Sequence, residues 1–141
     1  MRNDRGSVLF LYPVGFLIVL MLGAIAVDLG NVWLQQRRLA DAADSAANDA
    51  VTYGVDQNIL RSTGELELSN ARIDEIVAVS VAGQNLPPEA VVTDASGIVL
   101  AGVPAVTVTI ESEADLIFGR FVRSGGIGIS ATGVAELIDG G

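Results

Sequence analysis

The feature that most constrains this chain is an uncharged apolar run of twenty residues near its N-terminus. The run extends from Val8 to Val27, reads VLFLYPVGFLIVLMLGAIAV, and ends where Asp28 follows. An unbroken apolar run of about 18 or more residues is long enough to cross the roughly 30 Å hydrocarbon core of a bilayer as a helix. The apolar core of a secretory signal peptide is shorter and is followed by a small-residue cleavage site. The sequence therefore predicts one membrane-spanning helix, residues 8–27, that anchors the rest of the chain.

Charges on the two sides of the run indicate its orientation. Residues 1–7 form a short leader that carries Arg2 and Arg5, whereas the chain beyond Val27 is acidic. Basic residues close to a span favour its cytoplasmic side, so we expect a cytoplasmic N-terminus and an external C-terminal domain. Pro13 lies inside the run and removes one helical hydrogen bond, which predicts a kink there.

Residues 28–54, here called the stem, continue the helical pattern beyond the span. Small and apolar residues recur at three- and four-residue steps with no Pro or Gly between Asn31 and Tyr53, and this spacing predicts an amphipathic helix. If span and stem are continuous, the helix runs from Val8 to Tyr53 and is about 70 Å long. Its apolar face is mostly alanine, so a partner can approach closely. The face comprises Leu29, Val32, Trp33, Gln36, Leu39, Ala40, Ala43, Ala46, Ala47, Ala50 and Val51.

Residues 55–141 are expected to form a small external α+β domain. Residues 54–64 read as a loop, and a second helix begins at Ser69 or Asn70 and ends near Gly83. Its expected inward side chains are Ile73, Ile76, Val77, Val79, Ser80 and Val81.

The last third of the chain changes to a period of two residues. Residues 90–94 and 98–100 are short strand candidates separated by a turn at Ser96–Gly97, and residues 105–113 and 127–137 alternate more clearly. The fold class predicted is α+β and pilin-like: a long transmembrane helix continuing into a stem, then a helix and a small antiparallel sheet.

Composition argues against several function classes. The formal net charge is −9, and nucleic-acid binding needs clustered Lys or Arg. The chain contains no His and no Cys, and its basic residues are all Arg, so the usual metal ligands and general bases are missing. We therefore expect no nucleic-acid partner, no metal, no cofactor and no enzymatic activity.

Acidic residues at two places have alternative interpretations. Asp28 is either an intramembrane functional acid or a residue at the membrane interface, and the second is favoured. Glu111, Glu113 and Asp115 alternate on one strand face, where they form either a Ca²⁺ site or a solvated surface that resists strand pairing. The second is again favoured, because no calcium-binding loop motif is present.

Three consecutive motifs resemble a known family. The segment Gly6-Ser7 precedes the apolar run, Ala26-Val27-Asp28-Leu29-Gly30 closes it, and residues 37–47 read RRLADAADSAA. Together they resemble the N-terminal region of TadE/TadG-like proteins of tight-adherence (Flp, type IVc) pilus assembly, over roughly residues 5–53. The resemblance implies a minor-pilin-like inner-membrane protein whose partners are membrane lipid, other pilin-like subunits and the pilus-assembly machinery. It also implies a processing site between Gly6 and Ser7, although Leu11 occupies the position where cleaved pilins usually carry Glu.

Helix packing is the mechanism expected for such a subunit. The residues expected to take part are Ala26, Gly30, Leu39, Ala43, Ala46, Ala47 and Ala50. Ala26 and Gly30 form a close small-xxx-small pair within or beside the span. The stem alanines either dock on helices of other subunits or are covered by the protein's own strands. The alternative function, from a different class, is a single-pass anchored external binding module outside any pilus.

Overall fold

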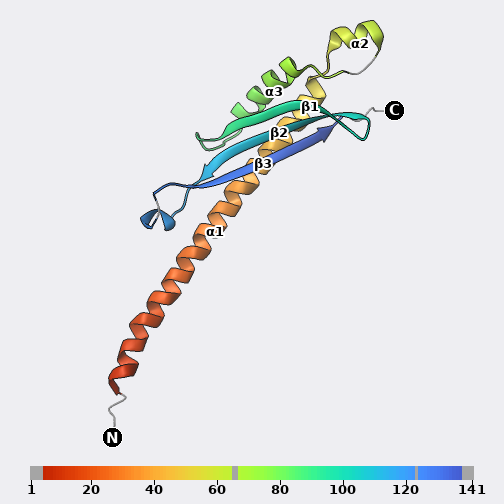
Figure 1. Ribbon diagram of the computed structural model, residues 1–141. Helices are drawn as coiled ribbons and strands as arrows, with labels where there is room; N and C mark the ends of the chain where they lie inside the picture. Colours follow the sequence, from red (N-terminus) through yellow and green to blue (C-terminus); the bar gives the residue numbers. More distant parts are fainter. Residues whose placement is uncertain (1–4, 65–66, 123, 138–141) are drawn as a thin grey trace.

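The computed structural model describes residues 5–64, 67–122 and 124–137. One helix dominates it: α1 runs without interruption from Arg5 to Tyr53 and passes through Pro13. At 1.5 Å per residue its 49 residues span about 74 Å. The N-terminal half of α1 projects alone, and the other elements gather along its C-terminal half (Figure 1). The predicted continuity of span and stem is confirmed.

Two further helices follow α1. The first, α2 (Gln57–Thr63), occupies the segment expected to be a loop. That expectation was wrong because a helix of seven residues is too short to show an apolar periodicity. Its first hydrogen bond runs from the Leu60 N–H to the Asp56 carbonyl, at 3.0 Å. The second, α3 (Asn70–Ala82), begins after Ser69 and is capped by Gly83, as predicted.

Three antiparallel strands complete the fold in the order β1-β2-β3. They are β1 (Val91–Leu100), β2 (Val103–Ala114) and β3 (Ile127–Glu136), with a short 3-10 turn, η1 (Gly119–Phe121), between the last two. The predicted turn at Ser96–Gly97 is wrong, since both residues lie inside β1 and pair with β2. The hairpin turn lies instead at Ala101–Gly102, where both residues have positive φ, 51° and 87°, as a two-residue type I′ turn requires.

Gly97 is a glycine because α3 passes close to it. The side-chain oxygen of Asn70 accepts the Gly97 N–H at 3.3 Å. A Cβ at Gly97 would lie 3.3 Å from that oxygen and 3.4 Å from the Ile73 side chain. The glycine thus marks a close approach of helix and strand, which a sequence pattern does not distinguish from a turn.

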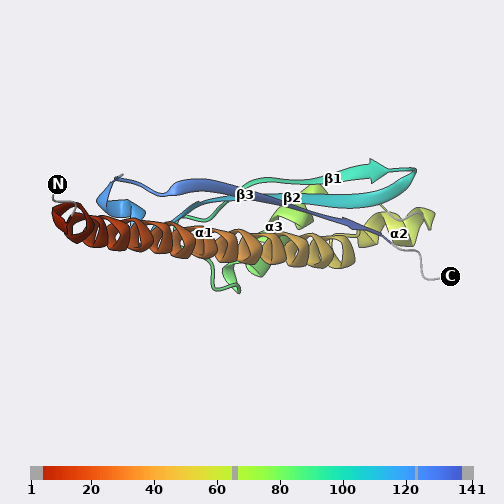
Figure 2. The same ribbon diagram turned by 90° about the horizontal axis from the view of Figure 1, so that it is seen from below.

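The core lies between one face of the sheet, the C-terminal half of α1, and α3. Figure 2 shows α1 and α3 on the same side of the sheet. In α3, Ile73 and Val77 are buried, whereas Val79 is 70% exposed and was wrongly expected to face inward. The core cluster joins the stem, α3 and the inward residues of β2 and β3 in one unit: Leu39, Ala42, Ala43, Ala46, Ala47, Ala50, Val51, Ile73, Val77, Val106, Val108, Ile110, Ala114, Ile129, Ala131 and Ala135.

Candidate functional site

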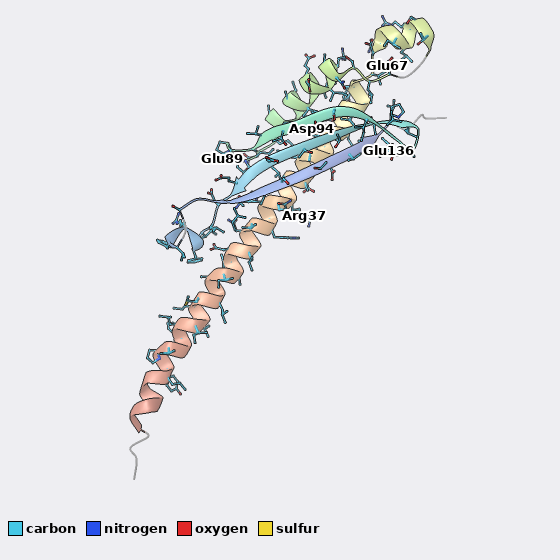
Figure 3. The ribbon with its side chains drawn as sticks, in the orientation of Figure 1. Arg37, Glu67, Glu89, Asp94 and Glu136 are labelled. Atoms are coloured by element: carbon cyan, nitrogen blue, oxygen red, sulfur yellow. The ribbon has the colours of Figure 1, made fainter. Side chains whose placement is uncertain are left out.

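The N-terminal part of α1 is an uncovered apolar rod. Between Leu11 and Val27 every large apolar side chain is exposed, by 45 to 79%, and the segment carries no charge. The labelled charged side chains Arg37, Glu89, Asp94 and Glu136 all lie at the sheet end of the molecule (Figure 3). This helix is long and apolar enough to cross a membrane, so the structure has the membrane-span candidate expected for residues 8–27. Gly6 and Ser7 lie in its first turns, and cleavage between them stays a prediction.

The alanine face of the stem is covered by the chain's own sheet and α3. Leu39 and the four predicted packing alanines at positions 43, 46, 47 and 50 are all at most 1% exposed within the single chain. A Cβ added at Gly133 of β3 would clash with the Ala43 carbonyl group and lie 2.5 Å from the backbone nitrogen of Asp44. The sequence left two alternatives for this face, and in the structure it is covered by the protein's own strands. These alanines therefore pack inside the chain, where the sheet occupies the space beside them, and packing of α1 on another subunit stays a prediction.

The lower end of the predicted face behaves differently. Leu29 and Trp33, expected to lie on the covered face, are 64% and 59% exposed. They point away from the side of α1 on which Asp28 and Asn31 bind the β2–β3 connection. The Arg37 guanidinium lies 5.8 Å from the centre of the Trp33 ring, a cation–π distance. Ala26 and Gly30 are exposed too, and no atom lies within 4 Å of a Cβ built on Gly30. This small-xxx-small pair is therefore free to contact a partner.

Asp28 fixes the connection between β2 and β3 to α1. One carboxylate oxygen accepts the backbone N–H groups of Ile117 at 2.7 Å and Phe118 at 2.9 Å. The other accepts the N–H of Gly119 at 2.6 Å. Position 119 favours glycine, because a Cβ there would lie 3.1 Å from the Asp28 oxygen and 2.7 Å from the Leu116 side chain. Three consecutive amide groups thus converge on one carboxylate.

Two polar side chains extend this attachment along the same face of α1. Asn31 donates to the Asp115 carbonyl at 2.8 Å. Gln35 accepts the Asp115 N–H at 3.3 Å and donates to the same carbonyl at 3.4 Å. Gln36 donates to the Ser130 carbonyl at 2.6 Å, one strand further along. The polar residues of the stem therefore form hydrogen bonds to the lower end of the sheet, while the alanines of the stem pack against its middle.

The hydrogen bonds also determine the ionisation of Asp28, which lies just outside the apolar span. The N–H of Phe118 lowers the pKa of the carboxyl most, burial raises it, and the N–H groups of Gly119 and Ile117 lower it further. The balance leaves the pKa of Asp28 below its ordinary value of 3.8. A carboxylate that accepts several backbone N–H groups is stabilised in its charged form. Asp28 is thus a structural anion, a role that neither sequence interpretation included.

Sequence reasoning missed this junction for a specific reason. The residues that Asp28 binds are 89 to 91 positions away, and their contribution is backbone N–H, which any residue except proline offers. One signal was available: Asp28, Asn31 and Gln35 recur at helical spacing. A polar stripe on a helix that is otherwise apolar at its base indicates a polar partner on that side.

The acidic residues on β2 are not gathered into a site. Glu111 and Glu113 are exposed and alternate with buried Ser112, on the outer face of the sheet. Within the described ranges no three acidic side chains lie close enough together to hold a metal ion. Asp115 is bound through its backbone to Asn31 and Gln35, as described above.

Comparison with known proteins points to one family. Residues 6–52 match the family model described as Tad, putative Flp pilus-assembly TadE/G-like. No curated protein and no solved structure gives a significant match. The matched segment is about a third of the chain and coincides with α1. The resemblance that the N-terminal motifs indicate is thereby confirmed: along its long helix, this chain is similar to TadE/G-like Flp pilus-assembly proteins, and this similarity supports a role associated with the Tad pilus.

Proposed function

We propose that this chain is a membrane-anchored, pilin-like component, of the minor pilin or pseudopilin type, of the Tad (Flp) pilus. The observation that carries the proposal is the division of α1 into an exposed apolar end and an end that forms part of a folded core. The family match over the same helix supports it. In this function the chain is a structural part of the attachment apparatus rather than an enzyme.

The apolar end of α1 crosses the cytoplasmic (inner) membrane of a bacterium, with the N-terminus inside and the sheet domain outside. The short leader with Arg2 and Arg5 and the acidic character of the chain beyond the span support this orientation, while Arg37 and Arg38 on the far side keep the difference in basic residues small. In the same proposal, processing between Gly6 and Ser7 would release a leader of six residues. Mass spectrometry of the mature chain tests that step, and an intact N-terminus contradicts it.

Contact with other pilin-like subunits occurs through the lower part of α1, because the alanine face of its upper part is already covered by the sheet and α3. Ala26 and Gly30 lie four residues apart and share one helix face. Asp28 is two residues from Ala26 and two from Gly30, about 200° round the helix from each, so the loop that it binds leaves this face open. Small residues allow two helix backbones to approach closely in lipid.

Cysteine crosslinking in native membranes tests the proposal cleanly, because the chain has no cysteine of its own. Ala26→Cys is the test variant, and Ala43→Cys is the matched control on the same helix, with its side chain under the sheet. We expect crosslinks from Ala26→Cys to pilin-like subunits and none from Ala43→Cys. An Ala26→Cys variant that stays monomeric, or crosslinks only to proteins outside the pilus, contradicts the proposal and favours an anchored binding module.

A further inference from the structure

The connection between β2 and β3 exposes an unusual number of large apolar side chains. Ile117 and Phe118 are 42% and 45% exposed, and Phe121 and Val122, further along the connection, are 79% and 93% exposed. The connection is nevertheless held in place by the Asp28 carboxylate. An ordered loop with four uncovered apolar side chains within six residues indicates contact with an apolar environment.

The position of this loop along α1 identifies that environment. Asp28 directly follows the apolar run, and hydrogen bonds of 2.6 to 2.9 Å place residues 117–119 at the same level of the helix. Phe118 also lines a shallow hollow together with Leu20, Ala24 and Val27 of the run. The exposed surface of the loop is thus continuous with the exposed surface of the membrane-span candidate.

We propose that residues 116–122 form a second membrane contact, in which Phe118 and Phe121 enter the boundary between lipid headgroups and acyl chains. The proposal rests on the membrane span of the proposed function. If the run crosses the bilayer, its last residue Val27 lies at that boundary, and the loop bound to Asp28 lies there too. The partner is the lipid surface itself.

The chemistry of the loop fits such a surface. Aromatic side chains concentrate at the membrane interface because their rings are largely apolar. The Arg120 guanidinium lies 5.5 Å from the centre of the Phe121 ring, and arginine beside an interfacial aromatic keeps its charge in the headgroup layer. The net charge of −9 opposes attraction to anionic lipid. The contact is therefore driven by apolar burial and takes place on zwitterionic bilayers as well.

The contact would restrict the orientation of the subunit. A single span leaves a domain free to rotate and tilt about the helix axis, whereas a second contact at its side defines which face of the domain looks toward the membrane. The loop lies on the Asp28 face, away from Ala26 and Gly30. One side of α1 would then face the lipid surface through the loop, and the opposite side would stay open to helices of other subunits.

Depth-dependent fluorescence quenching tests the proposal on the full chain in phosphatidylcholine vesicles. The single tryptophan is first removed by Trp33→Phe, and one tryptophan is then introduced at each of three exposed positions. Phe121→Trp is the test, Ile18→Trp reports on the span, and Val99→Trp, 72% exposed on β1, is the matched control outside the membrane. Two quenchers are used in parallel. One phosphatidylcholine is brominated near the top of its acyl chains, at the level expected for position 121, and the other is brominated near the chain ends, at the level expected for position 18.

We expect brominated lipid to reduce the fluorescence of the tryptophans at positions 18 and 121 and to leave that at position 99 unchanged. Quenching at 18 with none at 121 overturns the loop contact while the span stands. Absence of quenching at both 18 and 121 overturns the span as well. An unquenched tryptophan at 121 whose emission shifts to shorter wavelength with protein concentration assigns the patch to a protein partner, and also overturns the proposal.

Discussion

Replacement of Gly133 by alanine tests the close packing of the sheet on α1. Gly133 lies on the inward face of β3, and its added Cβ would clash with the Ala43 carbonyl and lie 2.5 Å from the Asp44 nitrogen. Ordinary van der Waals contact begins at 3.4 Å, so β3 has to move away from the helix by about 1 Å. The atoms in contact belong to the helix backbone and cannot rotate away as a side chain would.

The size of the effect follows from that displacement. Overpacking of a well-packed core costs about 1–3 kcal/mol, and occasionally more. A retreat of β3 also loosens the contacts of Ala131 and Ala135 with the stem, since all three positions face α1 along the same strand. We therefore expect Gly133→Ala to lower the free energy of unfolding of the sheet domain by about 3 kcal/mol.

Gly128→Ala is the matched control. Gly128 lies on the same strand and is exposed, and no atom lies within 4 Å of a Cβ built there. Since glycine in a strand is about 0.5–1 kcal/mol less stable than alanine, this change should be neutral or slightly stabilising. Native-state hydrogen exchange of β3 amides in detergent micelles measures both opening free energies. Equal values for the two variants would refute the packing argument and leave the stem alanines free for another partner.

Three further predictions concern separate features. Asp28→Asn should speed hydrogen exchange at residues 117–119 and leave the amides of β2 protected. Since the pKa of Asp28 is lowered, the stabilisation that its carboxylate gives the wild type is complete above the ordinary pKa of 3.8 and is lost as the pH falls through the lower folded-state pKa. Hydrogen exchange at residues 117–119, measured as a function of pH, checks this range. Ala101→Asn should raise domain stability by about 0.5–1 kcal/mol in denaturant titrations, because Ala101 has φ of 51° and Asn tolerates this conformation better in a type I′ turn; a loss of stability would contradict the turn assignment. Ser112→Ala should raise stability by about 1 kcal/mol or leave it unchanged in the same titrations, because the buried Ser112 hydroxyl has no hydrogen-bond partner within the described chain; a large loss would show that the hydroxyl is satisfied.

The elements with long, regular periodicity were predictable from the sequence. The continuous helix to Tyr53, the helix capped by Gly83, and the strands at residues 105–113 and 127–137 all occur at or close to the expected residues. Each depends on a repeating apolar pattern that reflects burial of one face. The family resemblance over the N-terminal helix is confirmed as well.

The errors share a physical cause, which is that one local signal serves several tertiary purposes. The glycine at position 97 was interpreted as a turn residue, but it accommodates Asn70 and Ile73 of α3. The turn at Ala101–Gly102 was missed because alanine rarely adopts positive φ.

The role of Asp28 and the burial of the alanine face depend on contacts across the fold. An apolar face predicts a covering partner without saying whether that partner belongs to the same chain. Only the placement of β3 over Ala43 decides between the two.

The unbroken course of α1 has a consequence for proteolytic shedding. A cut between Leu39 and Val51 would not release an intact sheet domain, because that stretch forms one side of its core. A fragment beginning at Gly54 would expose the inward side chains of β2 and β3 to water and would unfold. Release of a folded sheet domain requires a cut on the N-terminal side of Asp28, so that the fragment keeps the carboxylate that binds the β2–β3 connection.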